Sequence, residues 1–173
     1  GKKGDPAAMH LWNMWDWKEA GSFEGDEDPG QITPRILRWQ EAYDADVIVE
    51  TNKDGVAAAL QASNCPKLHW SGAQPGWFST EQSKSAALIG LVNMLRQRQG
   101  DEPWIRSAPT LNQLASWDGK TRAQESGRRK HHWDRAITVL IFAYGVQTLG
   151  YQRRPKPPPP EDRGFNMAKW LAS

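Results

Sequence analysis

The sequence predicts an α/β fold, and three features of the 173-residue chain support this prediction. Segments with the composition of strands alternate along the chain with segments that show the apolar spacing of helices. Residues 46–50 (DVIVE) have the apolar centre that is typical of an inner strand covered by helices on both faces. The connections between the expected strands are long enough to hold a helix, which favours parallel pairing.

The first expected strand is residues 7–17 (AAMHLWNMWDW), which are rich in aromatic side chains. Both of its alternating faces are largely apolar, so we expect it to be covered on both sides. Residues 21–30 (GSFEGDEDPG) are acidic and rich in glycine, and they are expected to form a loop. A helix is expected to follow, with Thr33 as its cap and Pro34 at its first position.

Two helices and one strand are expected after residues 46–50. The stretch VAAALQAS (56–63) is expected to be a short helix and KLHWSG (67–72) a strand. Ser79 and Gln82 resemble a capping box that opens a helix ending near residue 99. The apolar stripe of this helix is expected to consist of Leu88, Leu91, Val92 and Leu95.

The last part of the expected domain holds an edge strand and two helices. Residues 102–107 (EPWIRS) are expected at a sheet edge because they contain a proline. The stretch 109–117 is expected to be a short helix, and 131–150 a long one. The buried face of the long helix is expected to consist of Ala136, Val139, Leu140 and Ala143.

Residues 1–152 are therefore expected to form the folded domain, and residues 153–173 a tail. Four consecutive prolines in the tail predict an extended polyproline segment, and NMAKWLAS (166–173) is expected to form a short terminal helix. The net charge is only +2, so nucleic-acid binding would depend on local basic patches. Cys65 is the one cysteine, and no apolar run is long enough to span a membrane, so we expect a soluble, cytoplasmic protein.

Two carboxylates are candidates for a metal site. Glu50 ends the apolar run 46–50, and the carboxyl ends of parallel strands are where α/β sheets present functional side chains. Asp134 begins the last apolar helix. Metal-dependent hydrolysis of phosphodiesters needs converging carboxylates that hold ions about 4 Å apart, and Mg²⁺ or Mn²⁺ prefers such oxygen ligands. The alternatives are a surface acid at a strand end for Glu50 and a favourable first-turn helix acid for Asp134.

A basic cluster, GRRKHH, lies immediately before Asp134, where a phosphate backbone would approach a metal bound there. Its members that are candidates for DNA contact are Arg128, Arg129, Lys130 and His132, and Arg135 follows. The alternative is a solvated run of charge without a partner.

The order of three motifs resembles the nuclease domain of phage large terminases. In VIVETNKDGVAAAL (47–60) a strand ends in Glu and is followed by Asn and by a Gly that opens a helix. The stretch STEQSKSAALIGLVNML (79–95) is similar to the next helix of that family, in which a Lys follows a polar lead-in. The stretch 109–145 resembles its closing part, in which a His precedes the last acids and an alanine-containing helix.

The resemblance runs from about residue 5 to residue 150 and implies an RNase H-like fold, a mixed sheet flanked by helices on both faces. It implies that Glu50 and Asp134 are catalytic metal ligands, that Asn52 contacts the scissile phosphate, and that Gly55 opens the following helix. It also implies that Lys84 meets the DNA backbone and that His132 matches the family's histidine.

The chain departs from the family pattern in two places. The family's first catalytic Asp lies on a strand before residues 7–17, and the stretch GKKGDPAAM looks like the turn after that strand. The domain is therefore expected to be N-terminally incomplete, with Asp5 or Asp16 as the candidates to replace the first acid. The family's paired acids before the last helix are replaced by Trp133 and Asp134.

The resemblance implies a metal-dependent endonuclease that cuts concatemeric double-stranded viral DNA during packaging, in the host cytoplasm. It implies two Mg²⁺ or Mn²⁺ ions, and a terminase ATPase domain, a portal and a small terminase subunit as partners. No GxxxxGK[ST] phosphate-binding loop occurs in the sequence, so the ATPase would be a separate domain. The alternative is a non-catalytic, incomplete RNase H-like domain that acts as a DNA- or protein-docking module.

Overall fold

The computed structural model describes residues 7–51, 55–97, 103–117 and 133–150, and these residues combine helices with two small antiparallel sheets. The strands are β1 (Ala7–Asn13), β2 (Lys18–Gly25), β3 (Trp70–Ser71) and β4 (Gln74–Pro75). The helices are α1 (Pro29–Tyr43), α2 (Val56–Ala62), α3 (Glu81–Gln97), α4 (Ala108–Ser116) and α5 (Asp134–Thr148). None of the described helices is long and apolar enough to cross a bilayer. The proposed tail, 153–173, lies outside the described residues.

The first strand is shorter than the sequence suggests, because its end folds back into a hairpin. The Asn13 side chain accepts a hydrogen bond from the Trp15 N–H (2.9 Å), and the Asp16 side chain accepts one from the Lys18 N–H (3.1 Å). These bonds form the turn, and β2 then pairs antiparallel with β1. The expectation of a loop from residue 21 was therefore wrong, because pairing with β1 makes a strand of residues with little strand propensity of their own.

Helix α1 begins earlier than its apolar spacing suggests. The Asp28 carboxylate accepts a hydrogen bond from the Gln31 N–H (3.0 Å), and the Gln31 side chain accepts one from the Asp28 N–H (3.2 Å). This capping box starts the helix at Pro29, so the expectation that Thr33 caps it and Pro34 opens it was wrong. Pro34 instead lies inside the helix, where its nitrogen cannot donate to residue 30.

The inner strand expected at residues 46–50 is an extended segment with isolated parallel bridges, Val47 to Leu68 and Glu50 to Trp77. Parallel pairing is therefore present locally, but the described residues do not extend it into a parallel sheet. The strand expected at 67–72 is reduced to β3, which pairs with β4 in a small antiparallel hairpin. Left-handed backbone at Lys67 (φ 55°) and Gly72 (φ 64°) bends the chain on either side of it.

The region 103–107 and helix α3 also differ from the expectations. Residues 103–107 form no strand, because the N–H groups of Arg106 and Ser107 donate to the side chain of Glu19 and not to the backbone of a neighbouring strand. The start of α3 is held by reciprocal bonds between Thr80 and Ser83, not by a box of Ser79 with Gln82. The expected stripe of α3 is confirmed in part, because Leu91 is buried and Leu88 packs against the core, whereas Val92 and Leu95 are exposed. The buried face consists of Ala87, Gly90, Leu91 and Met94.

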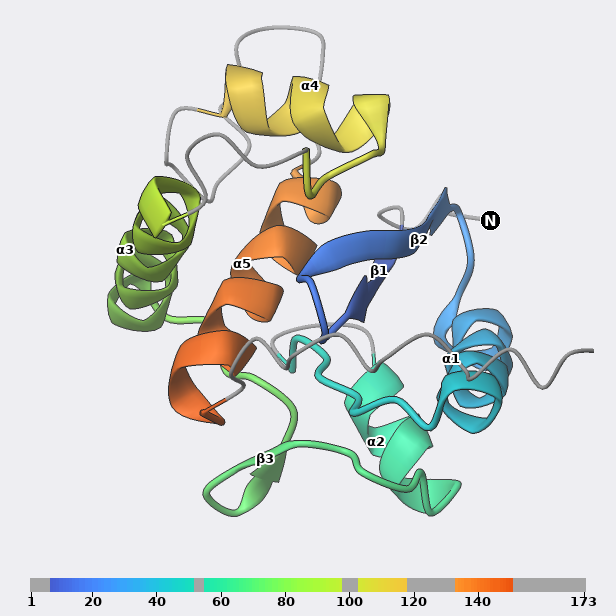
Figure 1. Cartoon of the computed structure of the whole chain (residues 1–173). Helices are drawn as coiled ribbons and strands as arrows, with labels where there is room; N and C mark the ends of the chain where they lie inside the picture. The colour runs from blue at the N-terminus through green and yellow to red at the C-terminus, as the bar shows by residue number, and fades with distance from the viewer. Residues whose placement is uncertain (1–6, 52–54, 98–102, 118–132, 151–173) are drawn as a thin grey trace, which may run out of the picture.

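Helix α5 is the centre of the larger hydrophobic core, and its expected buried face is confirmed. Figure 1 shows α5 between α3 and the β1–β2 hairpin, with α4 across its N-terminal end. Trp12 of β1 stacks on Phe142 of α5, with ring centroids 4.2 Å apart. A smaller core, formed by Val47, Leu60, Cys65 and Leu68, joins α1 and α2 to the extended segment 46–51.

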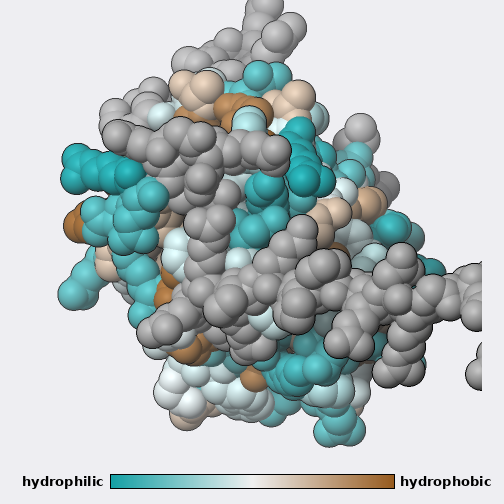
Figure 2. Space-filling view, viewed as in Figure 1, coloured by the Kyte–Doolittle hydropathy of each residue, from teal (hydrophilic) through white to brown (hydrophobic). Residues whose placement is uncertain are grey.

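The surface shown in Figure 2 is mainly hydrophilic where the described residues form it, and hydrophobic side chains reach it at the top, over α4, and at separate points on the left and lower left. Leu111 of α4 is one of the exposed apolar residues. Isolated exposed apolar side chains of this kind are common on protein surfaces and do not indicate a site by themselves.

Candidate functional site

Glu50 lies at the end of an extended segment that is held firmly against the chain around Trp77. The Trp77 N–H donates to the Val49 carbonyl (2.7 Å), and the Thr51 N–H and hydroxyl both donate to the Trp77 carbonyl (3.0 and 3.2 Å). Trp77 is 1% exposed and packs against Tyr144 of α5, with ring centroids 5.6 Å apart. The backbone of Glu50 is therefore fixed on both sides by bonds to a buried residue.

Gly76 allows these two segments to approach closely. Its backbone is left-handed (φ 89°), and a Cβ atom at this position would lie 2.5 Å from the Val49 carbonyl oxygen and 2.7 Å from the Thr51 methyl group. Any other residue would therefore have to push the segments apart. Gly76 therefore helps to position the segment that carries Glu50.

The Glu50 side chain is oriented by Ser79, whose hydroxyl donates a hydrogen bond to Oε1 of the carboxylate. Ser79 is buried, and Glu50 is half-buried. Residues 77–79 alternate as an extended chain does, because Trp77 and Ser79 are buried whereas Phe78 is exposed. The second carboxylate oxygen, Oε2, forms no hydrogen bond with the part of the chain that is described here.

Asp134 is the first residue of α5, and its carboxylate lies at the positive end of the helix dipole. The helix start is placed by Gln113 of α4, whose side-chain oxygen accepts hydrogen bonds from the N–H groups of Arg135 (3.0 Å) and Ala136 (3.3 Å). Asp134 itself is half-buried, with Oδ2 enclosed by the protein.

The two candidate acids are associated with different parts of α5. Trp77, which pairs with Glu50, contacts Tyr144, and Tyr144 lies ten residues after Asp134 in the same helix. At 1.5 Å per residue this corresponds to about 15 Å along the helix axis. Within the described ranges, no three His, Cys, Asp or Glu side chains gather closely enough to hold a metal ion.

The donor set at Glu50 is suitable in kind for Mg²⁺ or Mn²⁺, but the described residues do not complete it. A carboxylate with one oxygen oriented by a hydroxyl is the type of ligand that these ions take. A two-ion site needs further carboxylates.

The other expected site residues have different positions. Asp16 accepts a hydrogen bond within the β1–β2 turn, and Lys84 is half-buried in the first turn of α3. The guanidinium of Arg135 is 2.6 Å from the Glu24 carboxylate and is mostly buried, so it is engaged inside the protein. The remaining candidates lie outside the described residues: Asp5, Asn52, Arg128, Arg129, Lys130 and His132. Gly55 caps α2 with left-handed backbone (φ 69°), as the resemblance implies.

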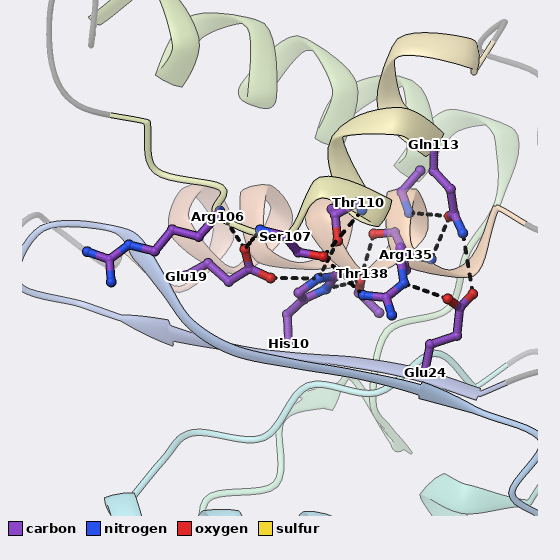
Figure 3. A network of polar contacts seen from close by, with 10 residues as sticks. His10, Glu19, Glu24, Arg106, Ser107, Thr110, Gln113, Arg135 and Thr138 are labelled. Carbon is purple, nitrogen blue, oxygen red and sulfur yellow. Dashed lines mark hydrogen bonds and ion pairs between the residues drawn. The ribbon is translucent and has the colours of Figure 1, made fainter.

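A buried polar network that the sequence reasoning missed joins the hairpin to α4 and α5 (Figure 3). His10 of β1 is at its centre, with Nε2 3.2 Å from the Glu19 carboxylate and 3.0 Å from the Thr110 hydroxyl. Its Nδ1 is hydrogen-bonded to the Thr138 hydroxyl. The side chains of His10 and Glu19 are 1% and 3% exposed. One indication of this network was present in the sequence, which is a histidine in a largely apolar strand.

The charged side chains of this network are stabilised by ion pairs and by hydrogen bonds to backbone groups. Burial lowers the pKa of His10 to about 4, with Arg135 acting in the same direction and the Glu19 and Glu24 carboxylates acting against it. Oε2 of Glu19 accepts the N–H groups of Arg106 and Ser107, both at 2.7 Å. Because these side chains are buried, the network connects elements of the fold and does not present groups to a substrate.

Comparison of the chain with protein-family models gives no match, and comparison with curated proteins gives no significant match.

Proposed function

We propose that the chain is a metal-dependent endonuclease domain of a viral DNA-packaging terminase large subunit, with an RNase H-like fold. It cuts concatemeric double-stranded DNA with Mg²⁺ or Mn²⁺ in the host cytoplasm, and it works with a terminase ATPase domain, a portal and a small subunit. The observation that carries the proposal is Glu50, a carboxylate at the end of a rigid extended segment that is paired in parallel and oriented by Ser79.

Two further observations support this proposal. Gly55 opens α2 directly after the Glu50 segment, and Asp134 opens α5, which matches the order of parts in the terminase resemblance. The β1–β2 hairpin and the segment ending at Glu50 both contribute side chains to the core around α5 (Trp12 and Ile48). A hairpin and a parallel-paired segment that pack on one helix are the parts of the described structure that support the proposed fold.

The test is cleavage of supercoiled plasmid by the purified chain with Mg²⁺ or Mn²⁺. Glu50→Gln and Asp134→Asn remove a charge with little change in shape, and each should reduce cleavage by about a hundredfold or more. The matched control is Glu41→Gln, because Glu41 is an exposed acid on α1. Cleavage that is equal in all four proteins would reject the proposal.

A second candidate function is a non-catalytic docking module for DNA or protein. It is favoured by the position of Asp134. Glu50 is paired with Trp77, and Trp77 contacts Tyr144, which lies about 15 Å along α5 from Asp134. This candidate predicts that the chain retards DNA in a gel with either metal but leaves the plasmid uncut. Retardation should then weaken steeply with salt, because phosphate contacts release counterions.

A further inference from the structure

We propose that one exposed face of helix α3 binds the same face of a second copy of this chain, in an antiparallel helix pair with two-fold symmetry. This outer face consists of Glu81, Ser85, Ile89, Val92, Leu95 and Arg96. Figure 1 shows α3 at the edge of the described structure, with α5 on its inner side. The proposal is independent of the proposed function, because the outer face shares no residue with the Glu50 site.

Three large apolar side chains lie next to one another on the outer face. Ile89 is 62% exposed, Leu95 46% and Val92 37%, and they recur every three residues along the helix. The core contacts of α3 are made by its opposite side, where Ala87 and Leu91 are buried. Single exposed apolar residues are common on protein surfaces, but a group of them bordered by polar residues is typical of a surface that binds another protein.

The charges on the outer face indicate that this protein is a second copy of the chain. Glu81 lies in the first turn of α3 and Arg96 in the last, and both are exposed. An antiparallel pair centred between residues 88 and 89 places Glu81 of each helix opposite Arg96 of the other. The two-fold symmetry therefore forms this ion pair twice, and the positive end of each helix dipole lies beside the negative end of the other.

The same register matches the sizes of the side chains. It places Ser85 of one helix opposite Val92 of the other, so that a large side chain packs against a small one. Ile89 lies beside the Ile89 of the second copy, next to the symmetry axis, and forms the centre of the apolar contact. One pair of 17-residue helices makes a small interface, so we expect a weak dimer with a dissociation constant of about 10 µM.

The test is sedimentation equilibrium of the whole chain from about 1 to 200 µM protein, without DNA or metal. Ile89→Lys should weaken dimerisation by about thirtyfold or more, because it places a charge from each copy at the apolar centre. Leu95→Lys should weaken it by about tenfold. Leu111→Lys is the matched control, because Leu111 of α4 is 46% exposed, as Leu95 is, and lies outside the outer face. It should dimerise as the unmodified chain does.

Exchange of the two charges tests the antiparallel register. Arg96→Glu places two acids opposite each other at both ends of the pair and should weaken dimerisation by about tenfold. Glu81→Arg together with Arg96→Glu makes the ends complementary again and should return the dissociation constant to within about threefold of its original value. Circular dichroism of each variant checks that the helices are retained, as expected for substitutions at exposed positions.

Three results would overturn the proposal. The first is a chain that stays monomeric over the whole concentration range, which would leave the outer face to a different macromolecule. The second is a dimer that Ile89→Lys leaves unchanged, and the third is a dimer that Leu111→Lys weakens as much as Leu95→Lys does. A dimer that Ile89→Lys dissociates but that the exchange of charges does not restore would overturn the antiparallel register.

Discussion

His10 shows how one buried side chain can make the whole protein sensitive to acid. Its pKa is lowered to about 4, chiefly by burial, whereas a histidine in an unfolded chain titrates near 6.5. The unfolded state therefore binds the proton first, and stability is lost as the pH falls from about 6.5 towards 4. This single group accounts for a loss of up to about 3 kcal/mol in the free energy of unfolding.

The replacement His10→Gln should remove this contribution, so the free energy of unfolding should depend less on pH between about 7 and 4. Urea unfolding at several pH values measures the difference in slope, whatever stability the variant loses at neutral pH. His69→Gln is the control, because burial also lowers the pKa of His69, but this residue is less enclosed than His10. Equal slopes for the unmodified chain and His10→Gln would contradict the assignment.

The Glu19 carboxylate holds the backbone at Arg106 and Ser107 in place by hydrogen bonds. Replacement by Ala leaves two backbone N–H groups, those of Arg106 and Ser107, without their carboxylate partner. Buried donors left in this way are costly, and Glu19→Ala should lower the free energy of unfolding by about 3 kcal/mol. Glu41→Ala, at an exposed position of α1, should change it by less than about 0.5 kcal/mol. Thermal or urea unfolding of both variants checks the difference.

At the level of elements, the register between the Glu50 segment and residues 76–77 depends on Gly76, which has no side chain. Gly76→Ala would place a Cβ atom 2.5 Å from the Val49 carbonyl oxygen, in left-handed backbone. The variant should lose about 2 kcal/mol or more of unfolding free energy. Gly72→Ala separates the two causes, because Gly72 is also left-handed but has open space, and it should lose only about 1 kcal/mol. Similar losses in a urea titration would show that the close contact is unimportant.

The elements that could be predicted from the sequence are those whose pattern is local. The apolar spacing of Ala136, Val139 and Leu140 predicts α5 and its buried face, and Gly55 marks the start of α2. The second strand, KEAGSFEG, has no such pattern, because its strand conformation comes from pairing with β1. The start of α1 was misplaced because the sequence contains two signals for a helix start, Asp28 with Gln31 and Thr33 with Pro34. The helix starts at the first of these, where Asp28 and Gln31 form reciprocal hydrogen bonds.

The same division applies to the candidate site. Glu50 could be singled out because an acid that ends an apolar run is visible in the sequence itself. The bond from Ser79 to Glu50 and the contact of His10 with Thr138 could not, since these partners are 29 and 128 positions apart. Contacts at such separations depend on how the elements pack, and no spacing rule in the sequence specifies them.

At the scale of the whole molecule, residues 46–51 connect the two hydrophobic cores. Val47 and Val49 face the smaller core with Leu60, whereas Ile48 packs against the larger core around α5. Alternation of side chains along an extended segment places neighbouring residues in different cores in this way. A disturbance in one core should therefore be transmitted to the other through this segment, which also carries Glu50.

Two leucines that are both fully buried test this coupling, Leu60 in the smaller core and Leu140 in the larger one. Leu60→Ala and Leu140→Ala should each lower the free energy of unfolding by about 2 to 5 kcal/mol, because each leaves a cavity. If the cores unfold together, each variant shows one transition, at the same urea concentration by tryptophan fluorescence and by circular dichroism. The larger core contains the buried Trp17, Trp77 and Trp104, so the part of the fluorescence that comes from these three residues reports on that core. A Leu60→Ala protein that loses helical signal before its fluorescence changes would show that the α1–α2 core unfolds separately and that the Glu50 segment does not couple the two.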